Sequence, residues 1–86
     1  PLAGAAQYWI AEALVRQGEY ERALYEYDRL IRTYPSNDKI PDAYYGIGMA
    51  LLRLGRSDEA QAQFRYVRDQ FAGTLAAQRA QNRLQE

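Results

Sequence analysis

The sequence contains no cysteine and no histidine. Without cysteine the chain forms no disulfide and no thiolate metal site, and without histidine it lacks the commonest general base. The two absences together remove the usual zinc ligands and the cysteine–histidine and serine–histidine pairs of nucleophilic enzymes. We therefore predict a protein that is not an enzyme and that has no metal and no cofactor.

A strong net charge and a long apolar run are also missing. The 11 basic and 11 acidic residues balance, and no basic stripe appears, so the sequence lacks the electrostatic field typical of proteins that bind nucleic acid. The longest apolar run, Ile47 to Leu52, includes Gly48 and ends at Arg53, whereas a membrane-spanning helix needs about 20 apolar residues. Residues 1–4 have neither the basic segment nor the apolar core of a signal peptide. We expect neither nucleic-acid binding nor direct membrane insertion.

The sequence does contain an internal repeat of 37 residues, the distance from Gly18 to Gly55. Ala43 and Ile47 also recur at the same distance as Ala80 and Leu84, which indicates a third unit consisting of one helix. The residues that recur between the first two units are small or apolar, with one arginine: Ala6/Ala43, Tyr8/Tyr45, Ile10/Ile47, Ala13/Ala50, Leu14/Leu51, Arg16/Arg53, Ala23/Ala60, Tyr27/Phe64, Leu30/Val67 and Tyr34/Phe71.

Within each unit the apolar residues step by three and four, which predicts helices and not strands. Gly18 and Gly55 suit the left-handed turn between two helices, and Pro41 suits the first turn of a helix. Ser57 and Thr74 are predicted N-caps. The sequence predicts five helices near residues 4–17, 20–34, 40–54, 57–71 and 74–85.

The predicted fold is an all-α superhelix made of two helix-turn-helix repeats and a C-terminal capping helix. The whole chain, residues 1–86, forms one domain, with the first repeat at about 4–37, the second at about 41–74 and the capping helix at about 74–85. Small residues such as Gly48 and Ala60 let the two helices of a repeat approach closely, while Tyr27 and Phe64 fill the space between them. These small and aromatic positions resemble the tetratricopeptide repeat (TPR), whose usual period is 34 residues.

The period is longer here by three residues, and the extra residues fall in the connection Ser36 to Ile40. The segment "TYPSNDKIPDAYYGIG" that contains it, with "AQYWIAEAL" (Ala6 to Leu14) and "QFAGTLAAQRAQNRL" (Gln70 to Leu84), resembles the C-terminal TPR domain of the YbgF/CpoB family of the Tol-Pal system. Ala72 and Ser57 depart from that family's proline and aromatic residue. The resemblance implies a periplasmic adaptor that binds TolA and takes part in envelope integrity and cell division. Two alternatives stay open, a BamD-like outer-membrane assembly lipoprotein and a structural module that forms a homo-oligomer.

In TPR domains the first helices of the repeats line a concave face, which is the usual protein-binding surface. By this resemblance we predict that ten residues form a protein-binding face; the alternative is that the tyrosines pack against neighbouring helices. Tyrosine, arginine and methionine are frequent at such interfaces. The predicted set is Tyr8, Glu12, Val15, Arg16, Tyr45, Met49, Leu52, Arg53, Arg79 and Asn82.

Trp9 is a separate prediction. Its counterparts in the other units are Gly46 and Arg83. A position that holds glycine and arginine in the other units does not suit a shared core, so we expect an exposed Trp9 that contacts a partner or another protomer. The alternative is that the N-terminal residues 1–4 cover it.

Carboxylate pairs are the remaining candidates for chemistry. Asp38 with Asp42, and Asp58 with Glu59, each lie at a predicted helix start, where the helix dipole favours acidic side chains. We therefore interpret both pairs as helix-stabilising and not as catalytic.

Overall fold

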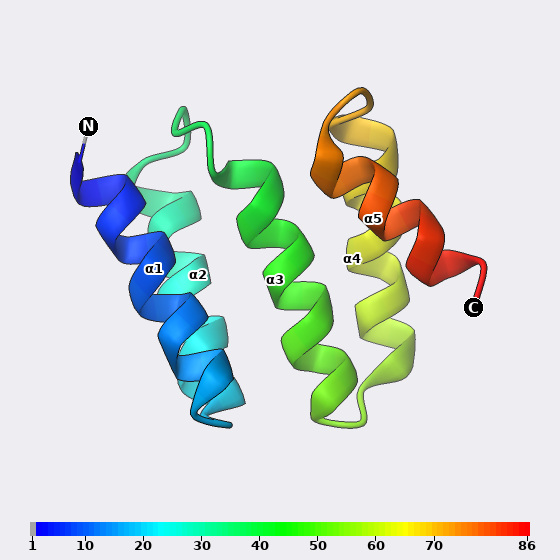
Figure 1. The fold of residues 1–86 in the computed structure, drawn as a ribbon, viewed down its shortest axis with the longest axis horizontal. Coiled ribbons are helices and arrows are strands. Elements are labelled where there is room, and N and C mark those ends of the chain that lie inside the picture. Colours follow the sequence, from blue (N-terminus) through cyan, green and yellow to red (C-terminus); the bar gives the residue numbers. More distant parts are fainter. Residues whose placement is uncertain (1) are drawn as a thin grey trace.

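The computed structural model describes residues 2–86, which form five α-helices. They are α1 (Leu2–Arg16), α2 (Tyr20–Thr33), α3 (Ile40–Arg53), α4 (Ser57–Gln70) and α5 (Leu75–Leu84). Successive helices reverse direction along the chain (Figure 1). The predicted all-α repeat fold is confirmed, and each helix ends within two residues of its predicted position.

The turns within the two repeats have the same geometry. Gly18 and Gly55 have φ angles of 80° and 78°, the left-handed conformation that glycine adopts without steric cost. In the first turn the Glu19 amide donates to the Leu14 carbonyl at 2.8 Å, and in the second the Arg56 amide donates to the Leu51 carbonyl at 2.9 Å. Both are the Schellman arrangement that closes a helix C-terminus. The glycine spacing therefore fixes two equivalent helix pairs.

The starts of the later helices confirm two of the three local predictions. Pro41 lies in the first turn of α3, where its missing amide donor has no cost. Thr74 caps α5, since its Oγ1 accepts a hydrogen bond from the Ala77 amide at 3.1 Å. The prediction of Ser57 as an N-cap is wrong. Arg56 occupies that place without a side-chain cap, because the preceding turn is so tight that Ser57 is already helical.

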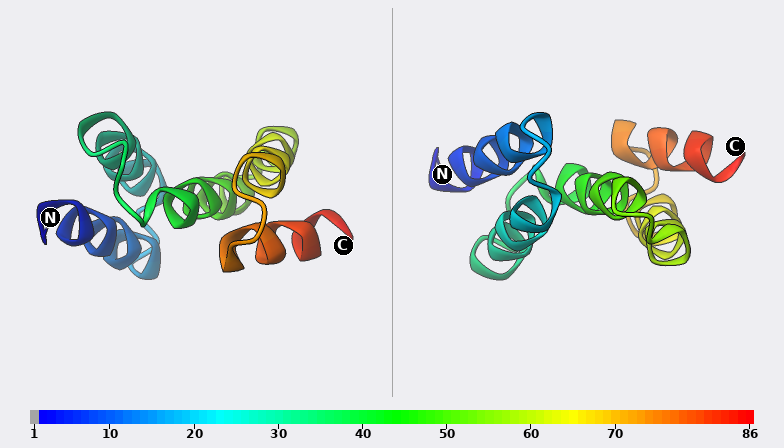
Figure 2. Two further views of the ribbon diagram at one scale, coloured as in Figure 1. Left: turned by 90° about the horizontal axis from the view of Figure 1, so that it is seen from above. Right: turned by 90° about the horizontal axis from the view of Figure 1, so that it is seen from below.

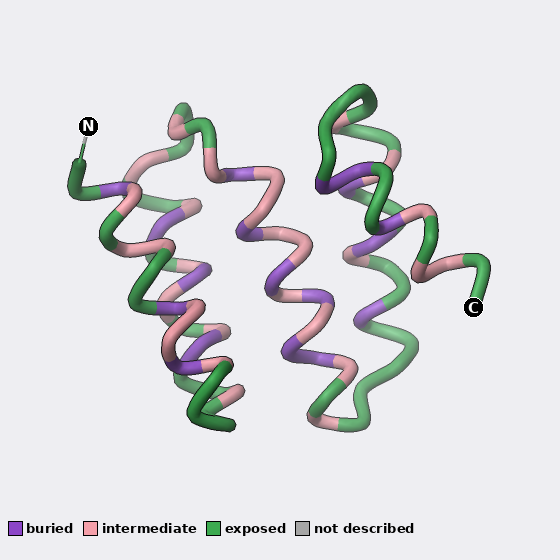
Figure 3. The backbone as a smooth tube through the Cα atoms, viewed as in Figure 1, coloured by how far each residue is buried: buried purple, intermediate pink, exposed green. Residues whose placement is uncertain are grey.

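Two buried clusters hold the helices together (Figure 3). One joins α1, α2 and the start of α3, and the other joins the end of α3 to α4 and α5. Tyr44 and Ile47 of α3 pack against both clusters and so connect them. The clusters consist of Ala11, Leu14, Ala23, Tyr27, Leu30, Ile40 and Ala43 in the first, and Leu51, Ala60, Phe64, Val67, Ala76, Ala77 and Ala80 in the second.

Glycines in α3 let two buried aromatic rings approach the backbone. A Cβ added at Gly48 would lie 2.5 Å from the Phe64 ring of α4, and one added at Gly46 would lie 2.5 Å from the Tyr27 hydroxyl of α2. Both distances are far below van der Waals contact, so these positions need glycine as long as the rings stay in place. Close packing on both sides of α3 therefore fixes its place at the centre of the domain.

The helices form two layers with α3 between them. Seen along the helices, α1 and α5 lie on one side of α3, and α2 and α4 lie on the other (Figure 2). This arrangement gives the molecule a concave face, with α3 in the middle and α1 and α5 on either side (Figure 2). No helix of residues 2–86 has both the length and the apolar character of a membrane span.

Candidate functional site

The concave groove is formed by α1, α3 and α5, the first helices of the three units. At the end where α3 and α5 begin, it deepens into a pocket of about 370 Å³. Aromatic, aliphatic and charged side chains from all three helices and from two connecting loops surround the pocket. They are Tyr8, Trp9, Asp38, Lys39, Pro41, Asp42, Thr74, Leu75, Ala76 and Arg79.

Lys39 and two aromatic residues form one wall of the pocket. The rings of Tyr8 and Trp9 meet edge to face with centroids 5.0 Å apart. Lys39 Nζ lies 5.3 Å from the centroid of each ring, within the range of a cation–π interaction. This wall presents apolar surface with a positive charge at its edge, a combination that suits a mixed apolar and acidic ligand.

Charged groups from three helices surround the Tyr8 hydroxyl. Its ring is half-buried, and burial, followed by the carboxylates of Glu12 and Asp42, raises its pKa well above the ordinary value. Arg79 opposes this shift in the pKa of Tyr8. Carboxylates of α1 and α3 and a guanidinium of α5 thus act on one hydroxyl group, and the pocket carries both signs of charge. Tyr8 and Arg79, both predicted to belong to the protein-binding face, line the same pocket.

The carboxylate of Glu12, a residue predicted to bind a partner, makes a contact within the first repeat. It accepts a hydrogen bond from the hydroxyl of Tyr27, a ring with no exposed surface. Burial and this bond raise the pKa of Tyr27 far above its ordinary value. Glu12 therefore stabilises the helix pair α1–α2, and a partner would reach only the part of its side chain that stays exposed.

The predicted residues of α3 divide between packing and exposure. Tyr45 packs on Phe64 with ring centroids 5.5 Å apart, and its hydroxyl accepts a hydrogen bond from Arg83 Nε at 3.4 Å. Met49 and Leu52 are half-buried against the second cluster, and Arg53 is exposed. For Tyr45 the structure favours the alternative of packing against the neighbouring second helix.

The other predicted residues lie elsewhere on α1 and α5. Val15 is half-buried against the first cluster, while Arg16 is exposed at the last turn of α1. Asn82 is exposed on α5. Neither Arg16 nor Asn82 lines the pocket described above. The pocket therefore unites only part of the predicted set, and its other members lie on the remainder of the three helices.

Trp9 is 52% exposed, as predicted, but its counterpart in the second repeat is not exposed. Its counterpart Gly46 is buried, and faces the Tyr27 ring of α2. In α3 this position is therefore part of the core between the repeats. No earlier helix of residues 2–86 covers α1, so the same position in α1 stays open to solvent.

Several residues that line the pocket, above all Lys39 and Leu75, are absent from the set predicted from the sequence. Lys39 was notable in the sequence only as its single lysine, and Leu75 is 61% exposed at the start of α5. Asp42 was interpreted only as a helix-start carboxylate. Both carboxylate pairs lie near helix starts, and no cluster of three or more potential metal ligands occurs within the described part of the chain.

Comparison with known proteins gives two matches to family models. Models described as tetratricopeptide repeat match residues 1–38 and residues 42–74. The first match contains α1 and α2, and the second contains α4 and nearly all of α3, so each corresponds to one helix pair of the fold. A search of the curated proteins gives no match to the chain.

Proposed function

Because the chain belongs to the tetratricopeptide repeat family, we propose that it is a protein-binding adaptor domain whose concave groove receives a helical or extended segment of a partner. TPR domains generally mediate protein–protein interaction. The observation that carries the proposal is the pocket between α1, α3 and α5, with aromatic walls and charges of both signs. Exposed aromatic and arginine side chains beside a pocket are the usual anchors of protein interfaces.

The more specific part of the proposal is a role in a bacterial cell envelope. The segments around Tyr34–Pro35, Tyr8–Trp9 and Arg83–Leu84 resemble the YbgF/CpoB family, which supports a periplasmic location and TolA as the partner. On this basis the domain acts in the Tol-Pal system, in envelope integrity and cell division. A BamD-like role in outer-membrane assembly is the competing envelope function.

Isothermal titration calorimetry with the soluble part of TolA tests the proposal. Arg79→Glu places an acid at the pocket edge, where Asp38 and Asp42 already lie, and should weaken binding about tenfold or more, as expected for an interface anchor. Arg22→Glu makes the same charge change at an exposed site of α2 outside the pocket and should leave affinity within about twofold.

Equal loss in both variants would mean that net charge and not the groove controls binding. Failure of the unmodified chain to bind TolA would refute the Tol-Pal assignment. In that case the same pair of variants, tested against the BamD-associated assembly proteins, decides between the two envelope roles.

A second candidate function, self-association, is favoured by a different observation. Leu2 and Ile10 of α1 are 83% and 50% exposed, and Leu75 of α5 is 61% exposed. These aliphatic side chains on α1 and α5 offer apolar surface that a second copy of the chain can cover. Multi-angle light scattering decides this point: a monomer at all concentrations excludes self-association, whereas a dimer that Ile10→Glu dissociates supports it.

A further inference from the structure

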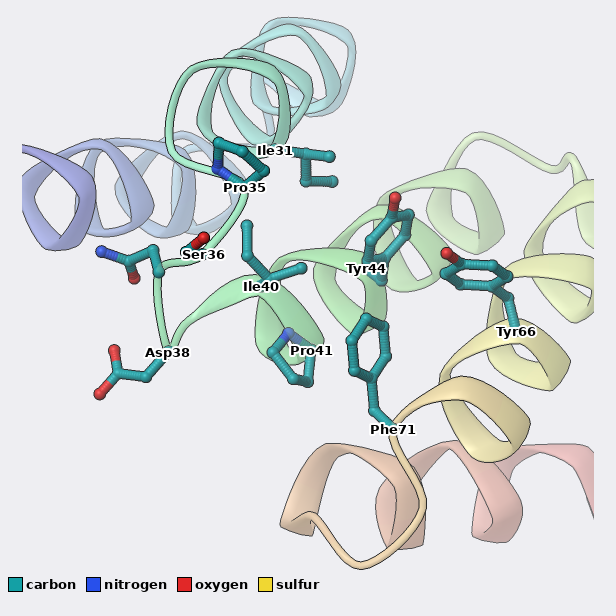
Figure 4. A pocket seen from close by; sticks show the side chains of 10 residues that line it. Ile31, Pro35, Ser36, Asp38, Ile40, Pro41, Tyr44, Tyr66 and Phe71 are labelled. Atoms are coloured by element: carbon teal, nitrogen blue, oxygen red, sulfur yellow. The ribbon is translucent and has the colours of Figure 1, made fainter.

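A second hollow lies on the opposite side of α3 from the concave groove, between the C-terminal ends of α2 and α4 (Figure 4). We call it the aromatic groove. Its volume is about 430 Å³, within the range of sites that take small ligands or a few side chains. It is lined by Ile31, Pro35, Ser36, Asn37, Asp38, Ile40, Pro41, Tyr44, Tyr66 and Phe71.

Three aromatic rings in mutual contact form one side of this groove. The Tyr44 centroid lies 4.8 Å from that of Tyr66 and 5.8 Å from that of Phe71, and Tyr66 meets Phe71 edge to face at 5.9 Å. Across from them lie Ile31 and Pro35 at the end of α2 (Figure 4). Although it packs against two rings, Tyr66 remains 44% exposed. The ring cluster therefore offers flat apolar surface to solvent.

The groove also offers hydroxyl groups beside its apolar surface. In Figure 4 the hydroxyl of Tyr44 points to the upper part of the view, and that of Tyr66 points from α4 toward Tyr44. Burial, then the neighbouring Tyr66 hydroxyl and the Asp28 carboxylate, raise the pKa of Tyr44, so its hydroxyl keeps its proton at neutral pH. A hydroxyl at the edge of an aromatic surface can donate to a carbonyl group that has no partner of its own.

The charge of the aromatic groove has one sign only. Asp38 is its one charged lining residue, whereas the Asp28 carboxylate, which acts on Tyr44 from the α2 side, is paired with Arg32 Nε at 2.6 Å. No lysine or arginine of the described chain lines it. The concave pocket differs, because Lys39 and Arg79 are part of its lining. The aromatic groove thus favours a ligand with a positive charge.

We propose that the aromatic groove binds a proline-rich segment of a partner protein, with a basic residue next to the prolines. Proline rings stack well on flat aromatic side chains, and the polyproline II backbone leaves its carbonyl groups free for donors such as tyrosine hydroxyls. An amphipathic helix fits less well. It needs a longer apolar surface, whereas the polar loop residues Ser36 and Asp38 border this groove.

The aromatic groove and the concave pocket share Asp38 and Pro41 in their linings but lie on opposite sides of α3, so the domain has two faces for two segments. Fluorescence anisotropy with a labelled oligoproline peptide that ends in arginine tests this. The unmodified chain should bind the peptide, and Tyr66→Ala should weaken binding about tenfold or more, as for an aromatic anchor. Tyr25→Ala removes another exposed tyrosine, outside the groove, and should not change affinity. Circular dichroism of each variant confirms that the helices remain.

Two altered peptides test the chemistry of the ligand. Replacing the prolines by alanines, or the arginine by glutamate, should each reduce affinity about fivefold or more if aromatic stacking and the acidic lining carry recognition. The proposal is overturned if the unmodified chain does not bind the peptide or if the alanine peptide binds equally well. It is also overturned if Arg79→Glu in the concave groove abolishes binding while Tyr66→Ala does not.

Discussion

Gly46→Ala tests how closely the two repeats must approach for the groove to form. The added Cβ would lie 2.5 Å from the Tyr27 hydroxyl and 2.8 Å from Cε1 of its ring. Tyr27 has no exposed surface, and its hydroxyl is held by Glu12, so the ring cannot turn aside without breaking that bond. Relief of the clash therefore requires α2 to move away from α3.

Three contributions set the magnitude. Overpacking of a core costs about 1–3 kcal/mol, and weakening the Tyr27–Glu12 hydrogen bond adds about 1 kcal/mol. Alanine in place of a helical glycine raises the free energy of unfolding by about 1 kcal/mol, because alanine has the higher helix propensity. We expect the free energy of unfolding to fall by about 1–3 kcal/mol, the sum of these values.

Urea unfolding followed by circular dichroism measures this change. Ala62→Gly, at an exposed position of α4, calibrates the helix propensity alone and should cost about 1 kcal/mol. Combining Gly46→Ala with Tyr27→Phe removes the clashing hydroxyl, so the double variant should lose about 1 kcal/mol less than the sum of the single variants. If Gly46→Ala instead stabilises the chain by the amount that Ala62→Gly costs, the close approach has no energetic consequence and the reasoning is refuted.

Three further predictions concern pH, helix capping and the pocket wall. The pKa values of Tyr8 and Tyr27 are raised above the ordinary 10.0, so their contribution to stability is complete below about pH 10 and is lost as the pH rises toward the folded-state values. The urea midpoint of unfolding should therefore fall above about pH 10, and it should fall less in Tyr27→Phe. A midpoint that stays constant above this pH would contradict the prediction. Thr74→Ala should lower the free energy of unfolding by about 1 kcal/mol, whereas Ser57→Ala, with no cap bond to lose, should change it little; equal effects in urea titrations would count against the capping assignment. Lys39→Ala should lower the free energy of unfolding by about 0.5–1 kcal/mol in the same measurement, and Lys39→Arg should lower it much less, because only arginine keeps a cation over the two rings. Equal losses in the two variants would refute the cation–π interaction.

Local signals made most of the fold predictable. Gly18 and Gly55 mark turns that require positive φ, and Pro41 marks a helix start, so each signal acts through the backbone of its own segment. Ser57 shows where this fails. Its residue type suits a cap, but the turn after Gly55 places Arg56 at the boundary, and the geometry of a turn outweighs a side-chain preference.

The candidate site was less predictable because partners distant in the sequence decide how each side chain lies. Glu12 turns toward Tyr27, and Tyr45 is held by Phe64 and Arg83, contacts that helical periodicity does not specify. Lys39 belongs to the loop before α3 and meets the two aromatic rings of α1 only in the folded chain. Periodicity therefore identifies the helices that line the groove but not the pocket within it.

Gly46 shows that equivalent positions in two repeats can differ in burial. Equivalent positions were expected to have equivalent surroundings, yet Gly46 is buried against α2 while Trp9 is exposed. The difference arises because, among residues 2–86, α3 packs against α2 and α4, whereas α1 packs mainly against α2. Equivalent positions in different repeats therefore need to be judged by the helices that pack against each of them.

The central claim is that a partner segment binds in the concave groove of α1, α3 and α5. Amide chemical-shift mapping of the isotope-labelled chain, titrated with the soluble part of TolA, tests it most directly. We predict that the largest shift changes follow the pocket, at Tyr8, Trp9, Lys39 and Arg79, and continue along the groove helices. Shift changes confined to the outer faces of α2 and α4, or no change at saturating TolA, would contradict the account.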